Sequence, residues 1–161
     1  MQYSQLKVVS LNVNGLNDPI KRGKVIAKLK KEKKGGYILV KGKIDNQIVT
    51  LVNVYTPPDS AKSFFKSFFK IVVQEIEGIL ICGGDFNITL NQVLDTTSAK
   101  KSSKTPVRRY LNTVLLELGI IDVWRELHPF ERDFTFYSAP HSVYTRIDYF
   151  FMNKADRFRI E

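Results

Sequence analysis

The sequence predicts an α/β protein built as a layered sandwich, with two β-sheets flanked by helices. Short runs rich in β-branched and aromatic residues alternate with longer segments whose apolar residues recur every three or four positions. The 161 residues are 43% hydrophobic, which is enough for one domain with its own core. No repeat and no linker interrupts the alternation, so we expect a single domain.

The N-terminal segment is predicted to form a strand followed by a helix. Residues 6–13 (LKVVSLNV) form a nearly continuous β-rich run, as in a strand that is covered on both faces. Asp18 can cap a helix whose first position is Pro19, and the apolar residues that follow recur at helical spacing.

A hairpin and a second helix are predicted next. Residues 37–44 and 47–55 are β-rich and flank the pair Asp45-Asn46, which suits a tight turn because both residues tolerate positive φ. Residues 63–77 place four phenylalanines and further apolar residues at three- and four-residue spacing, which predicts a helix with a wide apolar face. Core packing explains this stripe, and binding to a membrane surface is the alternative.

The second half of the chain is predicted to hold a strand at 79–82, a polar loop at 94–105, a helix from Thr105 to Leu118, and a strand pair formed by 134–137 and 144–151. Pro106 fits the first turn of that helix, and Gly119 fits the C′ position that ends it.

The chain carries an excess of positive charge, with 25 Lys and Arg against 16 Asp and Glu. This excess favours a polyanionic partner such as nucleic acid, or an acidic membrane surface, although solubility alone would also explain it. The single cysteine, Cys82, cannot form an internal disulfide, which favours a reducing compartment and a buried, inert thiol. We expect neither a signal peptide nor a membrane span.

The stretch 79–90 (ILICGGDFNITL) carries the candidate chemistry, because Asp85 and Asn87 follow directly on a predicted buried strand. In a basic protein, carboxylates and amides at strand ends suit phosphodiester hydrolysis. Asp85 could be the base for the attacking water or a ligand of Mg²⁺, and Asn87 could donate to a phosphate oxygen. The structural alternative is an Asx turn that ends a strand.

Four stretches read together resemble the endonuclease/exonuclease/phosphatase family: residues 11–17 (LNVNGLN), 52–57 (VNVYTP), 83–90 (GGDFNITL) and 134–151 (FTFYSAPHSVYTRIDYFF). Within that family they resemble in particular the apurinic-type endonuclease domain of long interspersed (LINE-type) retrotransposons. The resemblance covers nearly the whole chain. It implies a nuclease that nicks DNA with Mg²⁺, or with Mn²⁺ in its place.

The same resemblance implies a role for each matching residue. Asn12 would lie at the metal–phosphate site, and Tyr55 would contact the scissile phosphate. Asp85 would activate the attacking water, while Asn87 would position the phosphate and that water. Asp148 would hold a catalytic histidine in its tautomer.

DNA is therefore the expected partner, and no membrane partner is expected. By the resemblance, Thr135 would lie near the DNA backbone. Lys100, Lys101 and Arg108 cluster around the start of the predicted helix and would add phosphate contacts. A DNA-acting protein with one cysteine is expected inside the cell, in the nucleus or the cytoplasm.

The family pattern also predicts an incomplete site within one domain, residues 1–161. In the family, a strand with a metal-ligating glutamate follows the first helix, whereas here that helix runs into residues 35–42 (GGYILVKG). We therefore expect an internal segment near 34–36 to be missing, together with the family's closing Ser-Asp-His strand. Glu32 lies within the helix and is no substitute. Neither His128 nor His141 follows an aspartate.

Two functions follow as expectations: a Mg²⁺-dependent nicking endonuclease with lost or impaired catalysis, or a non-catalytic DNA-binding remnant of a retrotransposon protein. Without its imidazole, Asp148 is expected to have a raised pKa, unless Arg146 pairs with it along a regular strand.

Overall fold

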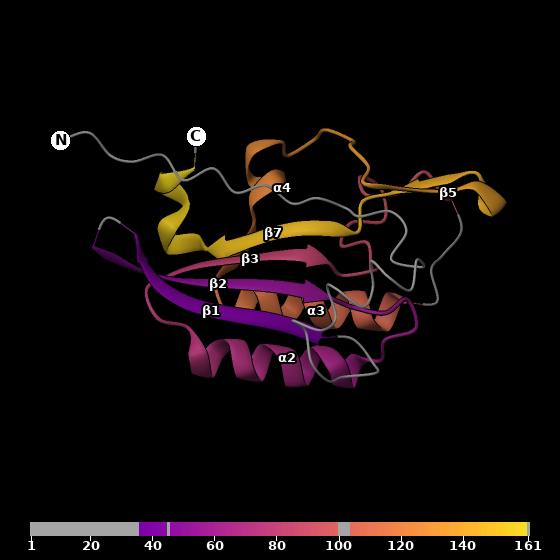
Figure 1. Cartoon of the computed structure of the whole chain (residues 1–161). Helices are drawn as coiled ribbons and strands as arrows, with labels where there is room; N and C mark the ends of the chain where they lie inside the picture. Colours follow the sequence, from indigo (N-terminus) through magenta and orange to yellow (C-terminus); the bar gives the residue numbers. More distant parts are fainter. Residues whose placement is uncertain (1–35, 45, 100–103, 161) are drawn as a thin grey trace, which may run out of the picture.

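The computed structural model describes residues 36–44, 46–99 and 104–160. Five strands form the larger sheet in the order β1-β2-β3-β7-β4. Their bounds are Gly36–Ile44 (β1), Gln47–Tyr55 (β2), Ile79–Asp85 (β3), Ile120–Asp122 (β4) and Asp148–Asn153 (β7). Strands β2 and β3 are parallel, and the other neighbours are antiparallel. A two-stranded sheet, β5 (Phe136–Ser138) and β6 (Val143–Thr145), extends beyond one end of the larger sheet (Figure 1).

Helices lie on both sides of the larger sheet. The two long ones, α2 (Lys62–Glu75) and α3 (Thr105–Glu117), cover one face, while the short helix α4 (Val123–Leu127) lies on the other side next to β7 (Figure 1). Two 3₁₀ helices, η1 (Ala139–His141) and η2 (Lys154–Arg159), complete the described elements. The predicted layered α/β fold is confirmed. The predicted strand at 6–13 and the helix after Asp18 lie outside the described residues.

The hydrophobic core lies between the sheet and the helices α2 and α3. Phe65, Phe68 and Phe69 of α2 are 1%, 2% and 4% exposed, and they pack against alternate residues of β2, β3 and β7. Phe86 lies at the centre, with its ring centroid 5.0 Å from that of Phe151. Each such phenylalanine contributes roughly 1.5–3 kcal/mol by burial. The apolar stripe of α2 is therefore a core face.

Cys82 belongs to the same core, where it is 2% exposed and has no disulfide. Burial raises the pKa of its thiol to about 12, so the reactive thiolate is scarce at neutral pH. The expectation of a buried, inert thiol is met.

The predicted hairpin and both predicted helices of the described region are confirmed. Ile44 pairs with Gln47, which leaves a two-residue connection, and Asn46 has a φ of 64°. Helix α2 ends at Glu75 rather than at residue 77, and Gly78 follows with a φ of +66°. A Cβ on Gly78 would lie 2.0 Å from the Ile48 carbonyl oxygen, so only glycine fits this turn.

The predicted strand 144–151 is wrong as a single element. It divides into β6 and β7, which belong to different sheets, and Arg146 and Ile147 lie between them. The Arg146 N–H donates to the Asp95 carbonyl, and the Ile147 carbonyl accepts from the Phe86 N–H. These two bonds lie outside either sheet ladder. Strand β4 and helix α4 were not predicted.

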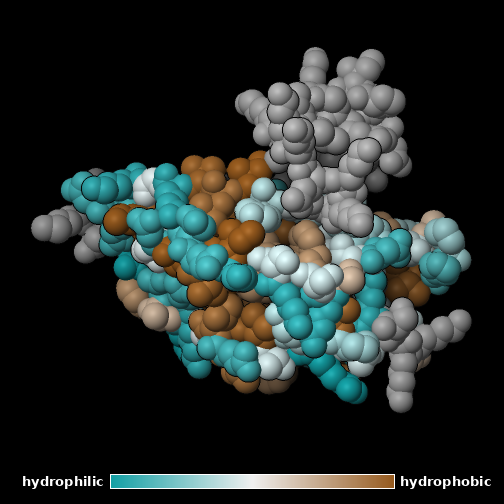
Figure 2. All heavy atoms as spheres, turned by 90° about the horizontal axis from the view of Figure 1, so that it is seen from below, coloured by the Kyte–Doolittle hydropathy of each residue, from teal (hydrophilic) through white to brown (hydrophobic). Residues whose placement is uncertain are grey.

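Figure 2 shows the side of the molecule that α2 and α3 cover, where hydrophobic atoms are visible between hydrophilic ones. Two apolar side chains on these helices are exposed, Val73 at 49% and Leu116 at 82%. Among the described residues, no helix is both long and apolar enough to cross a membrane.

Candidate nucleic-acid site

Three of the predicted site residues form a row across neighbouring strands. Tyr55 ends β2 and pairs with Asp85, which ends β3, and Asp85 pairs with Asp148, the first residue of β7. The parallel strands β2 and β3 bring their carboxyl ends to the same edge. The structure therefore places Tyr55, Asp85 and Asp148 side by side at one end of the sheet.

Asn87 completes this group through direct contacts with Asp85. Its backbone N–H donates to Asp85 Oδ1 (2.8 Å), and its Nδ2 donates to Asp85 Oδ2 (3.0 Å) and to the Thr56 carbonyl oxygen (2.7 Å). Asn87 adopts a left-handed φ of 48°, which is uncommon for a residue other than glycine. The Asp85-Asn87 pair thus has the geometry of the structural alternative, an Asx turn, and that turn holds the carboxylate in one orientation.

Burial raises the pKa of Asp85 from 3.8 to about 6. The Asn87 N–H opposes this shift by donating to the carboxylate, the neighbouring charge of Asp148 adds to it, and the Lys104 ammonium opposes it. A carboxylate with a pKa near 6 suits a general base at neutral pH, because it is ionised yet retains affinity for a proton.

Asp148 lacks a full set of partners. Its Oδ2 is buried and accepts no hydrogen bond within the described part of the chain. Burial raises the pKa of Asp148, and a hydrogen bond with the Thr135 side chain only partly opposes this. The carboxylate borders a cavity of about 270 Å³ that Thr135, Trp124 and Phe150 also line. The indole N–H of Trp124 is buried without a partner as well.

Thr135 supports the start of β7. Its hydroxyl oxygen accepts from the N–H groups of Ile147 (3.1 Å) and Asp148 (3.3 Å). The structure thus places Thr135 beside Asp148, and contact with a DNA backbone stays a prediction.

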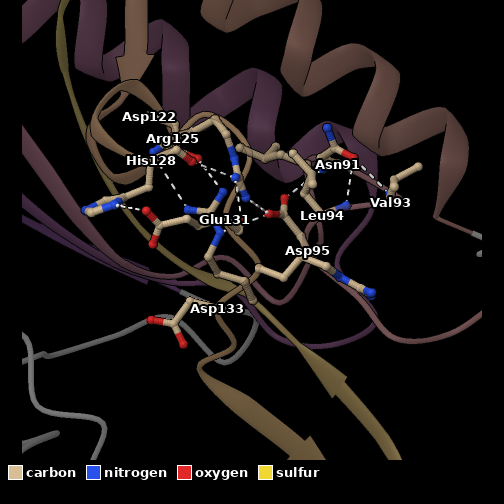
Figure 3. A network of polar contacts seen from close by, with 12 residues as sticks. Asn91, Val93, Leu94, Asp95, Asp122, Arg125, His128, Glu131 and Asp133 are labelled. Carbon is tan, nitrogen blue, oxygen red and sulfur yellow. Dashed lines mark hydrogen bonds and ion pairs between the residues drawn. The ribbon is translucent and has the colours of Figure 1, made fainter.

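The expectation that Arg146 could pair with Asp148 is wrong, because Arg146 belongs to a separate buried network. Its guanidinium contacts Asp95 (3.0 Å) and Asp122 (2.6 Å), and Asp95 also pairs with Arg125 (2.8 Å). Figure 3 shows Asp95 between the segment that carries Asn91 and the helix that carries Arg125. Arg146 lies between β6 and β7, and its ion pairs within the described residues are with Asp95 and Asp122 rather than with Asp148.

Within the described residues, neither histidine forms a hydrogen bond or ion pair with Asp85. His128 stacks on Trp124, with ring centroids 3.9 Å apart, and its Nδ1 lies 3.0 Å from Glu131 Oε1. His141 lies in η1, at the turn between β5 and β6. Within the described segments, neither imidazole forms a hydrogen bond or ion pair with Asp148.

The predicted basic cluster is only partly visible. Lys100 and Lys101 lie outside the described residues. Arg108 donates to Gln92 Oε1 (2.5 Å) and Thr105 Oγ1 (3.2 Å), so its role in DNA contact stays a prediction. Lys104 is not among the predicted site residues, although its Nζ donates to the Asn87 carbonyl oxygen (2.5 Å). The sequence places this lysine directly before the predicted helix start at Thr105-Pro106, and in the structure it is the N-cap residue of α3.

The described residues do not fit a Mg²⁺ site. In the ranges 36–44, 46–99 and 104–160, no group of three or more His, Cys, Asp or Glu side chains could hold a metal ion. Both carboxylate oxygens of Asp85 already accept from Asn87. Asn12, the predicted metal–phosphate residue, lies outside the described residues.

The sequence comparison finds a transposon protein. The chain is 33% identical over 103 residues to the Transposon TX1 uncharacterized 149 kDa protein of Xenopus laevis, which covers 61% of this chain and 8% of that protein. No protein-family model matches the sequence.

Solved structures with a similar fold include a retrotransposon endonuclease domain, a 3′ phosphatase and a further catalytic domain. The endonuclease domain of TRAS1, a telomere-specific non-LTR retrotransposon, matches with a TM-score of 0.54 and 21% identity over 74% of this chain and 51% of its own. The 3′ phosphatase NExo from Neisseria, bound to a product DNA hairpin, gives 0.57 and 21% over 82% and 57%. The catalytic domain of Xenopus laevis APE2 gives 0.54 and 21% over 82% and 49%.

The chain thus spans about half the length of these structures and a small part of the transposon protein. A transposon protein appears in the sequence comparison and a retrotransposon domain appears in the structure comparison. The fold of this chain is that of the endonuclease/exonuclease/phosphatase proteins, and its sequence is similar to that of a transposon protein.

Proposed function

We propose that this chain is a DNA-binding module of the nicking-endonuclease type, in which phosphodiester hydrolysis is lost or strongly impaired. The carrying observation is the row of Tyr55, Asp85 and Asp148 at one end of the sheet, with Asn87 bonded to Asp85. The resemblance assigns Tyr55 and Asn87 to the phosphate and Asp85 to the attacking water. It assigns Asp148 to the orientation of a histidine.

The row supports a phosphate ligand for three physical reasons. Tyr55 is 51% exposed, so its hydroxyl is available to a ligand. Lys104 adds positive charge beside Asp85, and the whole chain has a formal net charge of +9. DNA is a polyanion that a surface of this charge attracts without regard to sequence. The affinity of such binding falls steeply as the salt concentration rises.

Impaired hydrolysis is the second part of the proposal. A hydrolytic site of this type needs a base, a group that stabilises the leaving charge, and a metal held by a strong carboxylate. Asp85 supplies the base. His128 is engaged by Trp124 and Glu131, and Asp148 keeps an unpaired buried oxygen where the family's histidine would lie. Each missing member of such a unit lowers the rate by a factor of about 10² to 10⁴.

A non-catalytic DNA-binding remnant is the limiting case of this proposal, and the absence of an internal segment near residues 34–36 is proposed with it. DNA as the ligand also places the chain inside the cell, in the nucleus or the cytoplasm.

A plasmid-nicking assay tests the catalytic part. With Mg²⁺ or Mn²⁺ supplied, the purified chain is expected to nick supercoiled plasmid no faster than its own Asp85→Ala variant. Clear nicking that Asp85→Ala abolishes would show a complete site and overturn the claim of impairment.

A binding assay tests the DNA part separately. Duplex DNA of several unrelated sequences should bind with similar affinity, and the logarithm of the association constant should fall linearly with the logarithm of salt concentration. Binding that ignores salt, or no binding at low ionic strength, would remove DNA as the ligand.

A further inference from the structure

Lys104 links the start of helix α3 to the end of strand β3. It occupies the N-cap position of α3, and its side chain is not the usual capping group, since no side-chain cap bond is present there. Instead the ammonium donates to the backbone carbonyl of Asn87 at 2.5 Å. The lysine therefore joins two segments that are 17 residues apart in the sequence.

Asn87 passes this contact on to Asp85. The asparagine donates through its backbone and its side chain to both oxygens of the Asp85 carboxylate. Its left-handed φ of 48° carries a conformational cost, so the surrounding contacts must hold it in place. Lys104 supplies one such contact and the Thr56 carbonyl oxygen supplies another.

Lys104 also balances charge at the site. Asp85 faces the like charge of Asp148 across the β3–β7 ladder and the opposite charge of Lys104. The lysine in turn interacts electrostatically with the carboxylates of Asp59 and Asp85. Burial lowers the pKa of Lys104, while both carboxylates act to raise it. An ammonium is strongly hydrated, so its partial burial requires such compensation.

We propose that Lys104 is a positioning residue of this site: its ammonium holds Asn87 in the left-handed turn that orients Asp85, and it supplies the positive charge that keeps Asp85 ionised beside Asp148. This inference rests on the proposed function for its meaning in DNA chemistry. Its test uses the free protein.

Three substitutions separate hydrogen bonding from charge. Lys104→Met removes both, Lys104→Gln keeps an N–H donor without charge, and Lys104→Arg keeps both. Lys66→Met, on the exposed side of α2, removes the same charge elsewhere and serves as the control.

Two NMR signals report on the site in the folded protein: the backbone and side-chain amide resonances of Asn87, and the titration of the Asp85 carboxyl carbon. In Lys104→Met we expect the Asn87 signals to shift or broaden, and the Asp85 midpoint to rise by roughly half a pH unit or more. Lys104→Gln should retain the Asn87 signals but raise the midpoint. Lys104→Arg should restore both, and Lys66→Met should change neither.

Unchanged Asn87 signals together with an unchanged Asp85 midpoint in Lys104→Met would overturn the inference. A Lys104→Arg variant as strongly altered as Lys104→Met would overturn it too, since charge and donor are then both present without effect. If Lys104→Met does not fold, Lys104→Gln and Lys104→Arg still decide the electrostatic part. None of these measurements uses DNA. A failure to bind DNA would therefore contradict the proposed function and leave the inference about Lys104 unaffected.

Discussion

Two groups of buried charges lie near strand β7, and they differ in how completely they are paired. In the first, Asp95 is 0% and Arg146 3% exposed, and each faces groups of opposite charge. In the second, Asp85 and Asp148 face each other as like charges, and one Asp148 oxygen has no partner within the described part of the chain. We call the first group the closed network, because each of its carboxylates contacts an arginine, although Arg125 Nε is buried without a partner within the described residues. We call the second group the open pair, because its two carboxylates carry the same charge.

The buried ion pairs of Arg146 account for the break in the predicted strand 144–151. Arg146 pairs with Asp122 at the start of α4 and with Asp95 in the loop after β3. These three residues tie together a loop, a helix and the β6–β7 junction. Two residues further along, Asp148 is left at the edge of a cavity.

The largest expected effect is on the closed network. Asp95→Ala removes the partner of two arginines, one of them almost fully buried, and should lower the free energy of unfolding by about 3–5 kcal/mol. Urea denaturation followed by circular dichroism measures this loss. Glu117→Ala, at an exposed position of α3, is the matched control and should stay within about 0.5 kcal/mol of the wild type. Equal effects at the two positions would show that the network is not a structural centre.

A smaller loss is expected at the hydroxyl group of Tyr149, which borders the same network. This hydroxyl accepts from the Leu90 N–H (2.9 Å) and lies 2.9 Å from the Arg146 carbonyl oxygen. Tyr149→Phe leaves those backbone groups unpaired and should cost about 1–2 kcal/mol by thermal or urea unfolding. Tyr137→Phe, at a side chain that is 47% exposed, should have almost no effect. A neutral Tyr149→Phe would mean that water satisfies the backbone groups.

The open pair, Asp85 and Asp148, is expected to make the free energy of unfolding depend on pH. The pKa of Asp85 is raised in the folded state, so the unfolded chain releases this proton first as pH rises. The contribution of Asp85 to stability is therefore largest below about pH 3.8 and declines as pH rises toward about 6. Asp85→Asn should remove that decline, whereas the exposed Glu117→Gln should keep it. Urea titrations at pH 4, 5, 6 and 7 provide the measurement, and an identical slope in Asp85→Asn would contradict the expected role of burial.

The smallest effect is expected at Asp148. Asp148→Asn replaces a partly buried, unpaired carboxylate by a neutral group of the same shape, and should raise the stability at pH 7 by on the order of 0.5 kcal/mol. Asp95→Asn, the same change in the closed network, should destabilise instead, because Arg125 loses its carboxylate partner and Arg146 keeps only Asp122. A loss of stability in Asp148→Asn would indicate that a further group pairs with this carboxylate.

The sequence by itself determined much of the layered fold. Apolar spacing placed α2, and the Thr105-Pro106 start with Gly119 at the end placed α3. Two β-rich runs placed β1 and β2, and the Asp45-Asn46 pair marked their turn. These features depend on contacts within a few residues, which local patterns report well. The order of motifs also placed Tyr55, Asp85, Asn87 and Asp148 in one site, and the structure brings them to one end of the sheet.

Only the tertiary structure decided which charges pair. Asp95 lies in a stretch that looks like an ordinary polar loop, yet it is fully buried because Arg125 and Arg146 reach it from 30 and 51 residues away. The same long-range pairing engages Arg146 with Asp95 and Asp122 at the point where the predicted last strand divides. Lys104 likewise looks like one of several surface lysines until the start of α3 brings it to Asn87. The strength of an ion pair depends on the distance between its two charges. For residues far apart in the sequence, the tertiary structure sets that distance, and the local sequence does not predict it.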